Sequence, residues 1–215
     1  MSLKITEAKI YDALYSFFLK EGFELLMEKK QFRKNTPTGF INVIFSISEY
    51  EKDSDVWVEV HIGGRNNQIE QIAQQFLNVN LMDYRSDANT VVISTGKYND
   101  VKYFRYKIHD ADDLLAACES VIGFMTTTGL DFLKKVSQLD EINRLLNRFP
   151  TQPSKYLYNQ IHRCFKGLIA AKLTENPRYL PLIETYRKYI HQNGSEVELQ
   201  NYDRLVAYLQ YYSAN

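Results

Sequence analysis

The stretch "VWVEVHIGGRNNQIEQIAQQ", residues 56–75, decides the fold class of this 215-residue chain. Its first seven residues alternate between aliphatic side chains and polar or aromatic ones, which is the period of a strand with one face on a core. Beyond Gly63-Gly64 the apolar residues recur with a helical period over about 67–78. We therefore predict a half-buried strand that leads directly into an amphipathic helix.

Further helical and strand patterns lie on the N-terminal side of this stretch. Apolar residues at helical spacing predict a helix over 6–21, and Gly22 is suited to end it. Two apolar runs follow, at 23–32 and 40–50, and the turn-rich "NTPTG" separates them. This pattern predicts a β-hairpin whose loop is longer than two residues.

On the C-terminal side, two short strands are predicted at 90–94 and 103–108, joined by the turn-like "TGKYND". From Asp110 onward the period is helical, and "TTTG" at 126–129 interrupts it. We therefore expect an α+β fold, in which an antiparallel sheet of about five strands carries helices on one face. A C-terminal helical section follows the sheet.

The expected division of the chain lies near Pro150. Residues 1–150 would form the α+β domain, and residues 151–215 a helical section packed on it. The segment "TQPS", residues 151–154, has the turn-forming composition of a linker.

Composition narrows the range of partners and the location. The chain carries 26 basic and 26 acidic side chains, so no overall positive field is present to attract nucleic acid. No apolar run is long enough for a membrane span, and the N-terminus lacks the pattern of a signal peptide. Cys118 and Cys164 lie in apolar helical patterns, which is typical of buried thiols in a reducing compartment. We expect a cytoplasmic protein without a membrane anchor.

The sequence around Gly63-Gly64-Arg65 raises the question of an anion site. A strand, two glycines and a helix start could present backbone N–H groups to a phosphate. The glycine-rich fingerprints of nucleotide-binding loops are absent, however. Asn67 and Glu70 have the spacing of a capping pair, which favours a structural turn and cap.

Other candidate chemistry is sparse. The segment "HDADD", residues 109–113, could offer metal ligands, but the first acidic residues of a predicted helix serve equally well as cap and first turn. No catalytic motif is present, so we expect no bound metal, no cofactor and no intrinsic catalysis. The basic run Lys29, Lys30, Arg33 and Lys34 is interpreted as a solvated strand end.

The polar face of the predicted sheet is the strongest candidate binding surface. Trp57 and His61 on one strand, with Tyr103 and Arg105 on another, would project away from the apolar core. This mixture of aromatic and cationic side chains is typical of binding surfaces. The alternative is that the C-terminal helices cover this face.

Tyrosines are concentrated in the C-terminal section and suit either a protein interface or helix packing. The nine beyond residue 151 are Tyr156, Tyr158, Tyr179, Tyr186, Tyr189, Tyr202, Tyr208, Tyr211 and Tyr212.

Several short motifs within about the first 150 residues resemble an uncharacterised family of bacterial domains of unknown function. They are Gly22-Phe23, Phe32-Arg33, Ile41-Asn42-Val43-Ile44, Ser48 and Gly63, with the downstream stretch "VIGFMTTTGLDFLKKVSQLDEINRLL". The chain departs from this pattern at Ser46, where the family would have a glutamine. The resemblance implies an α+β fold and a bacterial source, and it brings no activity and no catalytic residues.

Three functional hypotheses remain. The first is a non-catalytic interaction or regulatory protein that binds another protein through the polar sheet face or the tyrosine-rich helices. The second is an enzyme with a small-ligand pocket between the sheet and the helices. The third is single-stranded nucleic-acid binding by the sheet face, which would need a local positive potential.

Overall fold

The protein is described by a computed structural model for residues 3–49, 55–77 and 85–212. The chain forms two compact units, each built from segments far apart in sequence. Unit 1 comprises Met1–Gly64 and Ile93–Lys135, and unit 2 comprises Arg65–Val92 and Val136–Asn215. This division differs from the expected boundary near residue 150, because 65–92 and 136–150 group with the C-terminal helices.

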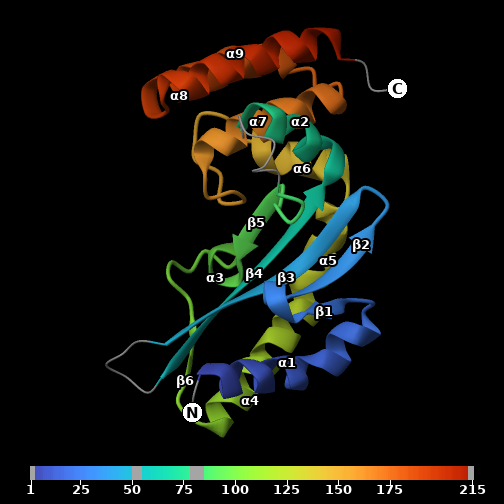
Figure 1. Ribbon diagram of the computed structural model, residues 1–215, viewed down its shortest axis with the longest axis vertical. Coiled ribbons are helices and arrows are strands. Elements are labelled where there is room, and N and C mark those ends of the chain that lie inside the picture. The colour runs from blue at the N-terminus through green and yellow to red at the C-terminus, as the bar shows by residue number, and fades with distance from the viewer. Residues whose placement is uncertain (1–2, 50–54, 78–84, 213–215) are drawn as a thin grey trace. The chain divides into compact units, whose positions relative to one another are not determined.

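The sheet has the strand order β1-β2-β3-β4-β5, and β6 also pairs with β4 (Figure 1). The β1–β2, β2–β3 and β4–β6 pairs are antiparallel. The α+β class, the antiparallel sheet and the C-terminal helical section are thereby confirmed. The strands are β1 (Glu24–Leu26), β2 (Gln31–Thr36), β3 (Gly39–Glu49), β4 (Val56–Asn66), β5 (Val91–Ser94) and β6 (Tyr106–Ile108).

The first hairpin differs from its prediction at both ends. Thr36 pairs with Gly39, so the loop contains only two residues and is shorter than expected. The run at 23–32 is not one strand, because the 3₁₀ turn Met27–Lys29 separates β1 from β2. Lys30, which ends this turn, has a left-handed backbone with φ 51°. The run therefore folds back on itself and pairs β1 with β2.

The second predicted hairpin is wrong, because β5 and β6 both pair with β4. Ser94 caps a short helix, α3 (Thr95–Tyr98), by accepting a hydrogen bond from the Lys97 N–H. Asp100 and Tyr103 then adopt left-handed backbones, with φ of 57° and 66°. The chain therefore reaches β6 only at Tyr106, and residues 103–105 are not in a strand.

An aromatic cluster forms the core of unit 1 between helix α1 (Leu3–Lys20) and the sheet. The Phe32 ring is fully buried and stacks on Phe18, with 4.3 Å between centroids. Tyr11 of α1 meets both Phe32 and Phe45 edge-on. Helix α4 (Ala111–Phe124) packs on α1 and β6, and it contributes Cys118 to the same core.

Helix α4 continues without a break into α5 (Leu130–Val136). The segment Met125–Gly129 between them is a π-helical turn. The Thr127 hydroxyl in this turn donates to the Gly123 carbonyl of α4 at 2.8 Å. The expected interruption at "TTTG" is thus a local widening of one helix.

Unit 2 is built around α7, which contacts each of the four other helices that the described residues form in this unit. The guanidinium of Arg163 on α7 is buried and donates to the carbonyls of Leu146, Phe149 and Gln152. These bonds tie the end of α6 and the "TQPS" segment into the unit, so that segment is not a free linker. The helices are α2 (Asn67–Leu77), α6 (Leu139–Asn147), α7 (Gln160–Leu173), α8 (Tyr179–Asn193) and α9 (Glu196–Tyr211).

The tyrosines of the C-terminal section divide between packing and exposure. Tyr186 and Tyr202 are fully buried, whereas Tyr211 is almost fully exposed. None of the helices in the described segments has both the length and the apolar character that crossing a membrane requires.

We predict that Phe32→Ala lowers the free energy of unfolding by about 3–5 kcal/mol, because it removes a ring from the centre of a closed core. Phe149→Ala, at a ring that is 57% exposed, is the matched control and should cost less than about 1 kcal/mol. Urea denaturation measures both values. Equal losses for the two variants would contradict this description of the core.

Candidate functional site

The polar face of the sheet in unit 1 is opposite the face that α1 covers. On β4, Val56, Val58, Val60 and Ile62 are buried, and Trp57, Glu59 and His61 between them are partly exposed. Lys107 pairs directly with Trp57 across β4 and β6, so it lies on the same face. The predicted alternation of β4 is therefore confirmed.

An open groove of about 710 Å³ lies on this face. We call it the β3 groove. Its lining comes from residues 44–48 of β3, residues 28–30 at the end of the 3₁₀ turn, and the side chains Glu59 and Arg105. Ser46 and Ser48 are exposed, as are Glu28 and Lys29, so the groove is lined by hydroxyls and by charges of both signs.

Glu59 connects two of the predicted binding residues. Its carboxylate lies 3.6 Å from Arg105 Nε and 3.5 Å from His61 Nε2. Burial lowers the pKa of His61, the Glu59 charge raises it, and the nearby Lys97 charge lowers it again. The net lowering favours the neutral imidazole, so the positive charge beside Glu59 belongs to Arg105.

The four predicted binding residues thus have different positions. Arg105 lines the β3 groove, and His61 adjoins it through Glu59. Trp57 is half-buried, and the Lys107 ammonium lies 5.8 Å from the centre of its ring. Tyr103 is 86% exposed in the turn before β6 and does not line the groove. Its expected position on a strand is wrong because the left-handed turn intervenes.

The second hypothesis placed a ligand pocket between sheet and helices. In unit 1 the cavity that Leu14, Phe45, Val58 and Val121 line between α1, α4 and the sheet measures about 10 Å³. Small-molecule sites typically measure roughly 300–1,000 Å³, and this cavity is far smaller. A second recess, between α1 and the β1 segment, measures about 210 Å³.

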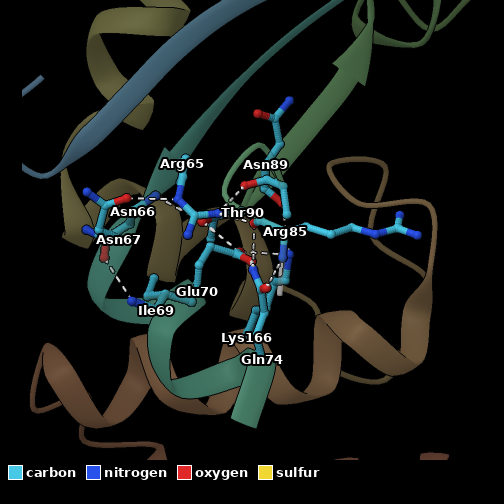
Figure 2. Close-up of polar contacts among 11 residues, drawn as sticks. Arg65, Asn66, Asn67, Ile69, Glu70, Gln74, Arg85, Asn89, Thr90 and Lys166 are labelled. Atoms are coloured by element: carbon cyan, nitrogen blue, oxygen red, sulfur yellow. Dashed lines mark hydrogen bonds and ion pairs between the residues drawn. The ribbon is translucent and has the colours of Figure 1, made fainter. Parts of the chain in front are cut away.

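The question raised by Gly63-Gly64-Arg65 has a structural answer. Both glycines continue β4, and Arg65 is buried. Figure 2 shows its guanidinium directed at the segment before Thr90, where Nη1 donates to the carbonyls of Arg85 and Ala88. The Arg85 side chain points away from this cluster, so only its main chain takes part (Figure 2).

The helix start after these glycines is capped by a different pair from the one expected. Asn66, rather than Asn67, accepts from the Ile69 N–H at 3.0 Å and caps α2. The Asn67 side chain accepts from Arg65 Nε instead. A protein side chain therefore already satisfies the Ile69 N–H in the first turn of α2.

Glu70 does not complete the cap, because it is fully buried and paired with Lys166 of α7. Their charged atoms are 2.7 Å apart, and Lys166 also donates to the Asn89 carbonyl (Figure 2). Thr90 Oγ1 and Gln74 Nε2 donate to the two oxygens of Glu70. Such a pair is stable in a core only when its remaining hydrogen-bonding positions are filled, as they are here.

The acidic segment at 109–113 has a structural role. Asp110 caps α4 by accepting from the N–H groups of Asp112 and Asp113, and Asp113 accepts from the His109 N–H. His109 and Lys107 both contact Asp55, which lowers the pKa of that carboxyl. Within the described residues, no group of three or more His, Cys, Asp or Glu side chains could hold a metal ion.

Sequence reasoning missed Lys29, Ser46 and Ser48 as part of a site. One signal was available, because the polar triplet Glu28-Lys29-Lys30 interrupts the apolar run at 23–32 and marks a turn. The Glu70–Lys166 pair had no local signal, since 96 residues separate the partners.

Comparison of the chain with protein-family models, with curated proteins and with solved structures gave no match. The resemblance of residues 1–150 to an uncharacterised bacterial family therefore stays a prediction.

We predict that Glu70→Ala lowers the free energy of unfolding by about 3–5 kcal/mol, because it leaves the Lys166 ammonium buried without its counter-charge. The control is Glu184→Ala, which removes an exposed partner of Arg187 and should cost about 0–1 kcal/mol. Chemical denaturation checks both values. A loss at Glu70 no larger than that at Glu184 would refute the importance of the buried pair.

A further prediction concerns pH. Because burial lowers the His61 pKa from its ordinary value of 6.5, the unfolded chain binds this proton more readily than the folded one. His61 therefore reduces the free energy of unfolding as pH falls below about 6.5. His61→Gln should make that decline shallower between about pH 7 and 5, as measured by urea denaturation at each pH. An unchanged slope would show that His61 does not titrate differently in the two states.

Proposed function

We propose that this chain is a non-catalytic binding protein whose β3 groove holds part of another protein. The observation that carries the proposal is the groove itself, an open recess of about 710 Å³ that is lined by charged and hydroxyl-bearing side chains. It lies on the polar sheet face on which a binding surface was expected.

The composition of the groove supports a polypeptide as ligand. Ser46 and Ser48 supply hydroxyl donors and acceptors, and Lys29 and Glu28 supply exposed charges of opposite sign. Arg105 retains 40% exposure of its side chain beside Glu59, so one side of its guanidinium can meet a ligand. Arginine held in this way is a frequent anchor at protein interfaces.

A regulatory role in the cytoplasm of a bacterium fits this proposal. This regulatory role rests on the resemblance of residues 1–150 and on analogy with small binding domains. It concerns where the protein acts, and the proposal for the groove does not depend on it.

The test is affinity capture from cells of the source organism with three baits. Ser46→Trp places a large ring in the groove at an exposed position, and Ser16→Trp places the same ring on the exposed side of α1. We expect the wild-type chain and Ser16→Trp to retain the same protein partner, and Ser46→Trp to lose it. Mass spectrometry of the captured material identifies the partner.

Two outcomes would contradict the proposal. Identical captured proteins for all three baits would remove the groove from consideration. Salt-sensitive capture of single-stranded nucleic acid by the wild-type chain would favour the nucleic-acid hypothesis instead.

A further inference from the structure

Strand β3 extends beyond the strand that pairs with it on one side. The β2–β3 register begins at Thr36 with Gly39 and ends at Gln31 with Ile44. Residues 46–49 continue β3 past this point, whereas the chain before Gln31 is the 3₁₀ turn Met27–Lys29. Figure 1 shows β3 running on past the start of β2. In the described part of the chain, no strand pairs with residues 46–49 on the β2 side.

The backbone of this extension presents hydrogen-bonding groups on the β2 side. The Phe45 N–H points toward that side, because it donates to the Lys30 carbonyl at 2.9 Å. Strand residues two apart direct their N–H and C=O groups alike, so Ile47 and Glu49 present theirs to the same side. Ser46 and Ser48 direct theirs toward β4.

Lys30 ends the β2 ladder. Because the backbone of Lys30 is left-handed, its N–H donates to the Met27 carbonyl and not to the Phe45 carbonyl. The 3₁₀ turn then leads the chain away from the line of β2. The β3 groove lies where β2 would have continued, since residues 28–30 and 44–48 both line it.

We infer that the occupant of the β3 groove is an extended segment of a partner protein that adds to the sheet as a strand beside residues 46–49 of β3. The inference rests on the proposed function, and it names the form of the ligand. Main-chain bonds to Ile47 and Glu49 supply the affinity, and side-chain contacts on the two faces select the sequence.

The charge of the groove indicates the chemistry of that segment. Three cations and two carboxylates line it, but Lys30 is already paired with Glu7 of α1 at 3.2 Å, so Lys29 and Arg105 are balanced by Glu28 and Glu59. Glu59 and its partner Arg105 lie on the face of Ser46 and Ser48. Phe45 and Ile47 lie on the opposite face, toward α1. The partner segment therefore alternates polar residues, of either charge, with apolar ones.

A second copy of the chain fits this edge less well. Two-fold antiparallel pairing of β3 about Ile47 would set Glu49 opposite the buried Phe45 of the other copy. The position opposite Phe45 is already occupied by Lys30, whose carbonyl accepts from the Phe45 N–H.

The experiment selects random 12-residue peptides displayed on phage against the immobilised full chain, and the enriched peptides are then synthesised. Ile47→Pro removes the N–H that faces the ligand, and proline is tolerated at a strand edge. Ile47→Val keeps that N–H. We expect Ile47→Pro to weaken peptide binding about tenfold or more and Ile47→Val to change it less than about twofold.

The peptides supply a second, independent measurement. Methylating their backbone nitrogens one at a time should weaken binding at every second residue, because only alternate N–H groups face β3. This alternation does not depend on whether Ile47→Pro folds, and thermal unfolding of that variant is recorded beside it.

The outcomes separate this inference from the proposed function. Peptides that Ser46→Trp displaces, but that tolerate Ile47→Pro and methylation at every position, would overturn strand addition and leave the groove as the binding site. No enriched peptide would also overturn it, whatever the affinity capture finds. A wild-type dimer that Ile47→Pro converts to monomer would assign the edge to a second copy.

Discussion

The burial of the Phe32 ring is the interaction on which unit 1 depends. It lies between Phe18 of α1 and the edges of Tyr11 and Phe45, so it joins the first helix to the strands β2 and β3. Because strand side chains alternate, a buried Phe32 and its partner Val43 place Ile44 and Ser46 on the opposite face. A shift of one residue in this register would expose the core and bury the serines. The polar groove thus follows from the packing of the apolar face.

Unit 2 depends on polar contacts to a greater degree. Glu70, Lys166 and Arg65 are all buried, and each bonds to the segment that enters β5 or to its neighbours. Apolar side chains could fill the same volume, but they would not distinguish one alignment of that segment from another. Directional bonds to the carbonyls of Arg85, Ala88 and Asn89 fix its position along α2 and α7. We attribute the burial of charge here to this requirement.

The sequence predicted the elements that depend on local periodicity. The alternation of β4 and the helical period after Asp110 were sufficient for the α+β class and for the polar face that bears Arg105. The positions of Tyr103 and Lys30 were not predictable in the same way, because their left-handed backbones arise from turns with no glycine. The role of Glu70 depended on a residue in another helix. The sequence therefore predicted which face of the sheet bears the site. Locating the groove on that face required knowing where β2 ends, which the sequence pattern did not give.

The π-helical turn at Met125–Gly129 affects which mutations this chain can tolerate during evolution. A single extra residue in an α-helix produces such a turn and rotates all later side chains by about 100°. Within the turn, Thr126, Thr127 and Thr128 are three identical residues, so removing any one yields the same sequence. That deletion would restore a regular helix and rotate Phe132 and Leu133 away from the core that now buries them. Loss of one threonine codon is therefore a far larger change than substitution of that threonine.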